Sequence, residues 1–129
     1  MIVELPWPKP PLTGNDRGHT RFRSPLVKQT LGEARMAVRR ANLTPVVGAI
    51  VVLHWQIPTR GRRDSDNLGP TLKECLDALV LEGVLPDDSW VHVPHSGNTI
   101  HPPNGEPARM WLELTPPDGE EFQAWGGVA

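Results

Sequence analysis

Two pairs of aspartates stand close together in the middle of this 129-residue sequence, and the first pair is the clearest candidate for chemistry. Asp64 and Asp66 are two positions apart and are followed directly by Asn67. Because residues two apart can point to the same side of an extended segment, both carboxylates can face one cation. Carboxylate oxygens are ligands that a hard cation such as Mg²⁺ prefers, so this pair predicts a metal site.

The second pair, Asp87 and Asp88, follows a segment with helical spacing of apolar residues. A helix that returns toward the sheet could bring this pair beside the first one. Each pair also has a structural alternative. The first could cap the helix or form ion pairs with neighbouring arginines, and the second could be a solvated turn.

Basic residues precede the first pair. Arg60, Arg62 and Arg63 lie in the same predicted loop, and guanidinium groups bind phosphate oxygens well. Residues 1–63 contain 11 Lys and Arg against 3 Asp and Glu, a net charge of +8, whereas residues 64–129 contain 2 against 12, a net charge of −10. A basic half predicts a polyanionic partner, although the two halves could instead neutralise each other in the fold.

Two other side chains with possible roles have structural alternatives. Lys73 lies about two helical turns beyond Asp66, and its alternative is an ion pair with Asp77 four residues on. His54 alternates within a buried strand, and we interpret it as a core residue with its hydrogen bonds satisfied. His19 stands in a loop that contains Arg17, Arg21 and Arg23, so this segment is a candidate for contact with phosphate.

The elements that must position these residues follow from hydrophobic periodicity and helix caps. The pattern predicts strands over 2–6, 46–57, 90–95 and 108–115, helices over 24–42 and 67–82, and a loop over 96–107. The run over 46–57 is nearly all apolar and rich in β-branched residues, as in a strand buried on both faces. We therefore predict a single α+β domain over residues 1–115, in β-α-β-α-β-β order, with one mixed sheet packed by two helices. Composition predicts a disordered acidic tail over residues 116–129.

Composition also limits the class of protein. A single cysteine excludes an intramolecular disulfide and a cysteine metal cluster. No apolar run approaches the roughly 18 residues that a membrane span needs, so we expect no membrane partner. The first residues lack the charged start and long apolar centre of a signal peptide. A cytoplasmic location fits these features.

The segment from Arg62 to Asp88 resembles the RusA family of crossover junction endodeoxyribonucleases, the Holliday junction resolvases of phages and prophages. The matching pieces are the Arg62-Arg63 run, D-S-D-N at 64–67, the lysine, D-A-L at 77–79, Gly83, D-D at 87–88, and L-P-W-P at 5–8. One departure is that Lys73 follows Asn67 by six positions, with Gly69-Pro70-Thr71 as apparent extra residues. Counting back from Asp77 restores the match of the lysine.

The resemblance implies a homodimer in a bacterial host cell that uses Mg²⁺, for which Mn²⁺ could substitute, to nick opposed strands of four-way DNA junctions in recombination and repair. Residue by residue, it implies Asp64, Asp66 and Asp88 as catalytic acids and metal ligands, with Lys73 as a catalytic lysine. We interpret Arg60, Arg62, Arg63 and Asn67 as contacts to the DNA backbone. The alternatives are a branched-DNA-binding protein without cleavage and a D-x-D phosphohydrolase, which usually needs a longer parallel sheet.

Overall fold

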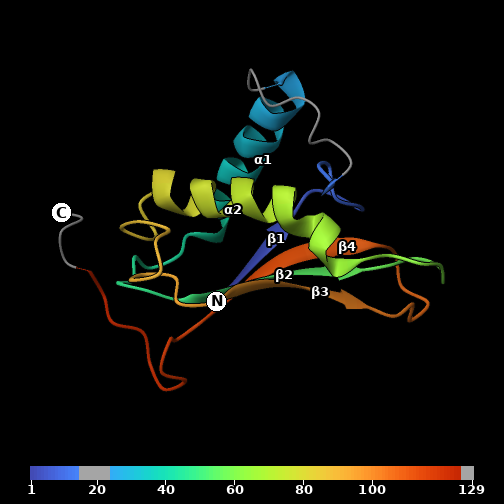
Figure 1. Cartoon of the computed structure of the whole chain (residues 1–129). Coiled ribbons are helices and arrows are strands. Elements are labelled where there is room, and N and C mark those ends of the chain that lie inside the picture. Colours follow the sequence, from blue (N-terminus) through green and yellow to red (C-terminus); the bar gives the residue numbers. More distant parts are fainter. Residues whose placement is uncertain (15–23, 126–129) are drawn as a thin grey trace.

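The structure is a computed structural model that describes residues 1–14 and 24–125. It is an α+β domain of two layers, in which one mixed four-stranded sheet carries both helices on the same face (Figure 1). The elements in chain order are β1 (Ile2–Leu5), α1 (Pro25–Ala41), β2 (Ile50–Gln56), the 3₁₀ turn η2 (Ser65–Leu68), α2 (Gly69–Leu81), β3 (Ser96–His101) and β4 (Arg109–Thr115). The predicted fold class and β-α-β-α-β-β order are therefore confirmed.

The ends of α1 follow from its sequence. The Ser24 side chain accepts a hydrogen bond from the Val27 amide at 3.2 Å, and Pro25 occupies the first helical position. Asn42 ends the helix in the left-handed conformation, which asparagine tolerates better than most residues. A second contact fixes the helix pair, because Glu82 after α2 accepts hydrogen bonds from Arg35 at 2.7 Å and from Arg39 at 2.9 Å. These hydrogen bonds lower the pKa of Glu82, with Arg39 contributing most.

The strand order in the sheet is β1-β4-β2-β3. β2 pairs antiparallel with β4 and parallel with β3, and α2 makes the connection between the two parallel strands. α2 therefore starts beyond the carboxyl end of β2 and returns to its amino end (Figure 1). This direction decides where the two aspartate pairs lie.

The core lies between the sheet and the helices. Val51, Leu53, Leu112 and Leu79 are fully buried members of it. β2 alternates between such buried residues and half-buried ones, so the expectation of burial on both faces is wrong. The opposite face of the sheet carries no helix from the described part of the chain (Figure 1).

The third strand lies later than predicted, at 96–101 instead of 90–95. The amides of His92 and Val93 both bond to the Ser89 carbonyl, at 3.0 and 2.8 Å, so this segment forms turns. Its alternation of apolar residues arises because Val93 packs into the core from a turn. Residues 96–101 have weak strand propensity, but pairing along β2 makes them an edge strand.

Residues 116–125 differ from the predicted disordered tail. The Val47 amide donates to the Gln123 carbonyl at 2.7 Å, and Val46 and Ala124 form an isolated bridge. Phe122 packs against the core, which explains why this segment is held. In the described residues, no helix has the length and apolar character needed to cross a membrane.

Candidate nucleic-acid interface

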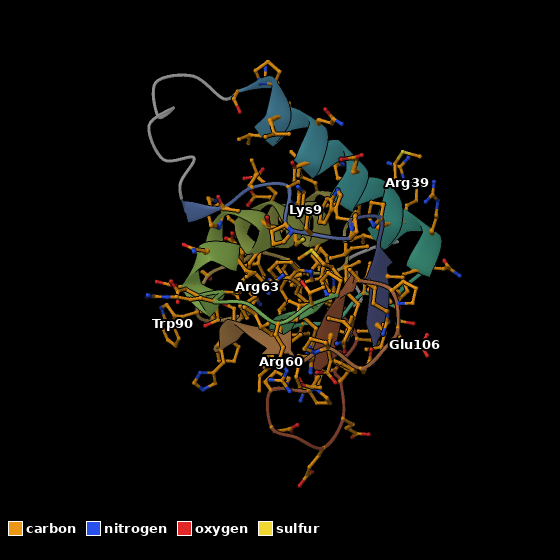
Figure 2. All side chains as sticks on the ribbon, turned by 90° about the vertical axis from the view of Figure 1, so that its right-hand side faces the viewer. Lys9, Arg39, Arg60, Arg63, Trp90 and Glu106 are labelled. Atoms are coloured by element: carbon orange, nitrogen blue, oxygen red, sulfur yellow. The ribbon has the colours of Figure 1, made fainter. Side chains whose placement is uncertain are left out.

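The carboxyl end of β2 leads into an exposed loop that contains the predicted arginines and the first aspartate pair. The loop borders a pocket of about 300 Å³. Residues from three parts of the chain line it: Lys9, Pro10, Thr13, Trp55, Arg62, Arg63, Asp64, Asn67 and Leu68. Four of the residues predicted from the sequence therefore come together here. Figure 2 shows Arg60 and Arg63 well separated from Arg39 on α1.

The arginines of this loop are available to an external anion. The Arg62 side chain is 90% exposed, and its nearest ionic partner is Asp64 at 3.6 Å. Arg63 donates to the carbonyl oxygens of Thr59 at 2.8 Å and Gly61 at 3.3 Å, so its position is set by its own loop. Arg60 is exposed as well. Exposed guanidinium groups on one loop can hold neighbouring phosphates of a nucleic-acid backbone.

Trp55 and the amino-terminal segment are functional candidates that the sequence did not identify. Trp55 is half-buried, and it lines the pocket. Its indole nitrogen donates to the Pro8 carbonyl at 3.0 Å. The Leu12 carbonyl accepts from Thr71 of α2 at 2.7 Å, so this segment is fastened beside the loop and brings Lys9 to the pocket.

Asp64 and Asp66 are both exposed at the start of η2. Asp64 has an extended backbone and occupies the cap position of η2, where its side chain makes no capping hydrogen bond. Its contact with Arg62 is the ion pair that the sequence allowed as an alternative to metal binding. Asp66 lies in the first turn of η2. Two carboxylates thus stand on the loop that carries the arginines.

Asp88 lies at the other end of the molecule from this pair. α2 has 13 residues, which corresponds to a length of roughly 20 Å. Beyond it, the Val46 amide bonds to the Val84 carbonyl at 2.9 Å, which places the following loop at the amino end of β2. Among the described residues, no three His, Cys, Asp or Glu side chains are placed to share a metal ion. The expectation that Asp64, Asp66 and Asp88 form one cluster is therefore wrong for a single chain.

Lys73 is paired with Asp77, at 3.5 Å from each carboxylate oxygen. This is the structural alternative that the spacing allowed, and the lysine side chain is 67% exposed. The segment that contains His19 and its neighbouring arginines lies outside the described residues.

His54 belongs to a hydrogen-bonded cluster on the sheet face without helices. Its ring nitrogens contact His101 at 2.8 Å and Glu113 at 2.9 Å, so the prediction that its hydrogen bonds are satisfied is confirmed. Its assignment to the core is wrong, because His54 is half-buried on the face of the sheet away from the helices. Trp111 stacks on both imidazoles. Burial, followed by His54 and Arg109, lowers the pKa of His101. No signal in the sequence linked these residues, because the cluster depends on the strand register.

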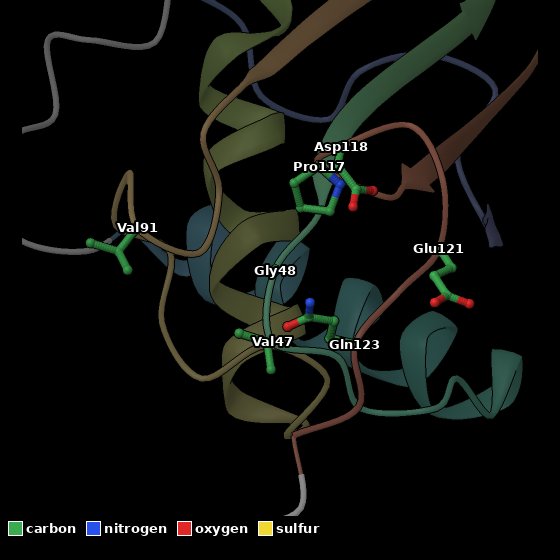
Figure 3. A pocket seen from close by; sticks show the side chains of 7 residues that line it. All are labelled: Val47, Gly48, Val91, Pro117, Asp118, Glu121 and Gln123. Carbon is green, nitrogen blue, oxygen red and sulfur yellow. The ribbon is translucent and has the colours of Figure 1, made fainter.

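The amino end of β2 has the opposite charge character. A smaller pocket of about 190 Å³ there is lined by Val47, Gly48, Val91, Pro117, Asp118, Glu121 and Gln123 (Figure 3). Asp87 and Asp88 lie in the loop next to this end. The pocket has two carboxylates and no basic side chain in its lining, so it does not suit a phosphate. Charge therefore separates along the sheet, and the basic end is the nucleic-acid candidate.

Comparison with known proteins found a related sequence that carries no description of function. No family model matches the chain. An uncharacterized protein of Xylella fastidiosa (strain Temecula1) is 36% identical over 110 residues, which cover 76% of this chain and 72% of that protein.

Proposed function

The chain belongs to the same family as this Xylella fastidiosa protein, and we propose that it is a Mg²⁺-dependent endonuclease that nicks four-way DNA junctions as a homodimer. The observation that carries the proposal is the loop after β2, where Asp64 and Asp66 accompany the exposed Arg60 and Arg62 and the half-buried Arg63 at the basic end of the sheet. The resemblance of residues 62–88 to RusA-type resolvases supports the same activity.

In this proposal, Arg60, Arg62 and Arg63 hold the DNA backbone, and Asn67 adds an amide beside them. Contacts to phosphates position a protein on DNA without reading its bases. Such contacts suit an enzyme that recognises the shape of a branched substrate. The carboxylates at the amino end of β2 would repel DNA, which favours binding at the opposite end.

Two of the three predicted metal ligands, Asp64 and Asp66, lie together on the loop. Mg²⁺ is usually held by one or two carboxylates together with substrate phosphates and water, so Asp64 and Asp66 can supply the protein ligands. The ion, when bound, polarises a phosphate and lowers the pKa of a bound water. Asp88 can join this pair only from the partner subunit, because α2 separates them within one chain. Lys73 can contact the phosphate only if it leaves Asp77.

A homodimer follows from the reaction that we propose. One chain carries one acid pair and can cut one strand, whereas resolution of a junction needs two opposed cuts. A two-fold dimer supplies two equivalent sites for the two equivalent arms.

The substitution Asp66→Asn tests the proposal. It removes a carboxylate and one negative charge next to the phosphate, so nicking should be lost while junction binding stays equal or becomes tighter. Asp118→Asn, at the acidic end, is the matched control and should nick normally. Loss of binding together with nicking in a folded Asp66→Asn protein would assign the residue a structural role.

A second candidate is a branched-DNA-binding protein without cleavage. The observation that favours it is that Asp64 pairs with Arg62 and Lys73 pairs with Asp77, as in a purely structural arrangement. It predicts junction binding with no product in Mg²⁺ or Mn²⁺.

A further inference from the structure

Binding of a DNA backbone leaves one feature of the basic end unexplained, which is the indole of Trp55. Arginines on the loop are sufficient to hold phosphates, yet they surround a pocket with an aromatic floor. The ring packs against the core on one side and is fixed by its hydrogen bond to the Pro8 carbonyl. A rigid aromatic ring beside phosphate-binding groups is a typical platform for a nucleobase.

The other groups of the pocket match the remaining parts of a nucleotide. Its volume of about 300 Å³ lies at the lower end of the range for small-molecule sites, roughly 300–1,000 Å³. Asn67 offers an amide, which can donate to and accept from the edge of a base. Gly14 leaves room for this amide, since a Cβ atom there would lie 2.8 Å from the Asn67 oxygen. Lys9 and Arg62 supply positive charge for the attached phosphates.

We propose that this pocket binds one unpaired nucleobase of the DNA substrate, stacked on Trp55. The proposal rests on the proposed function and names the feature of branched DNA that the protein recognises, because bases at a branch point can leave the helical stack. Asp64 lines the same pocket, so a base held there places its own phosphate beside the proposed catalytic pair.

Binding of the base also requires the Arg63 side chain to move. Its guanidinium lies over the Trp55 ring, 5.4 Å from the centroid, and so occupies the face that the base needs. Within the described part of the chain, its hydrogen bonds run to two carbonyl oxygens of its own loop. An incoming base displaces the guanidinium, which then turns toward the phosphate of the same nucleotide.

The test is the affinity of wild-type protein for four-way junctions that carry one abasic site, placed in turn at each branch nucleotide or within an arm. Stacking of a base on an aromatic side chain corresponds to roughly a 5- to 150-fold change in affinity. We expect a loss of this size at one symmetry-related branch position and no loss for sites within the arms.

Two variants complete the test. Trp55→Leu should bind the intact junction more weakly by the same factor and should no longer respond to the abasic site. Trp90→Leu is the matched control, since Trp90 is 81% exposed in the loop after α2 and lines no part of this pocket, and it should respond like wild type. The abasic series on wild-type protein gives the answer even if Trp55→Leu does not fold.

The outcomes separate this inference from the function on which it rests. Equal affinity for all abasic junctions, with normal binding and Mg²⁺-dependent nicking of the intact junction, would overturn the base pocket and leave the proposed function standing. An abasic loss that persists in folded Trp55→Leu would also overturn it. A protein that does not bind the junction at all would overturn both.

Discussion

Replacing Arg62 and Arg63 together by alanine should change the salt dependence of DNA binding by a calculable amount. Both side chains extend from the loop after β2. Their own contacts are the 3.6 Å pair of Arg62 with Asp64, the hydrogen bonds of Arg63 to loop carbonyls, and the stacking of Arg63 over the half-buried Trp55. None of these contacts belongs to the core, so the double variant should fold. It would lose two candidate phosphate contacts and would leave Asp64 without its partner.

The magnitude follows from counterion release. Each lost phosphate contact lowers the slope of log K against log salt concentration by about 0.9, so the double variant should lose about 1.8. Across a roughly fourfold change, from about 50 to about 200 mM salt, the affinity gap between wild type and variant should therefore shrink by about 12-fold. The loss should be the same for a junction and a linear duplex, because both DNAs present the phosphate backbone that these two arginines contact.

The assay is fluorescence anisotropy of labelled junction and duplex over a series of salt concentrations. Arg40→Ala is the control, because Arg40 is an exposed arginine of α1 next in sequence to Arg39, and Figure 2 shows Arg39 well separated from Arg60 and Arg63 of the loop. Its slope should equal that of wild type. An unchanged slope for the double variant would show that Arg62 and Arg63 serve contacts within the protein and not with DNA.

Three further predictions concern stability. Glu82→Gln should lower the Tm at neutral pH. The difference in Tm between wild type and variant should vanish as the pH falls through the pKa of Glu82, which lies below the ordinary glutamate value of about 4.3. A Tm difference that persists at lower pH would refute the ion-pair origin. The lowered pKa of His101 means that protonation opposes folding, so stability should fall as the pH drops below about 6.5. In urea titrations, His101→Gln should weaken this loss of unfolding free energy on acidification. The control His95→Gln, at an exposed residue, should not weaken it. Leu79→Ala, at a fully buried site, should cost roughly 2–5 kcal/mol of unfolding free energy by the same method, and a cost near zero would contradict the core assignment.

The sequence predicted the helices and three of the strands well because their signals are local. Ser24 and Asn42 cap α1 by short-range hydrogen bonds, and the apolar spacing of α2 is visible along the chain. β3 was misplaced because its position depends on pairing with β2. Residues 96–101 form a strand through that partner and not through their own propensity.

The candidate site was predicted where it is continuous in sequence and not where it depends on direction. Arg62, Arg63 and Asp64 are neighbours in one loop, so their meeting required no knowledge of the fold. Asp88 was placed with them because the number of residues in a helix does not say which end of the sheet it returns to. α2 runs antiparallel to β2 and separates the pairs by its whole length.

Trp55 shows a different limit of sequence reasoning. In the structure, Trp55 follows the buried Val51 and Leu53 at alternate positions of β2, which is the pattern of a core residue. At the carboxyl end of the strand, however, the ring lines the pocket and its indole nitrogen donates to the Pro8 carbonyl. Only the arrangement of the amino-terminal segment over that end makes the ring a candidate binding surface.

The most direct test of the proposed activity is incubation of the purified chain with a labelled four-way junction, a linear duplex and a single strand, each with and without Mg²⁺. We predict paired nicks in opposed strands of the junction, only in the presence of the ion, and none in the other two DNAs. Asp66→Asn in the same assay should yield no product, which would exclude a contaminating nuclease. Junction that stays intact in Mg²⁺ and in Mn²⁺ while bound to the protein would contradict the endonuclease proposal and leave a DNA-binding protein.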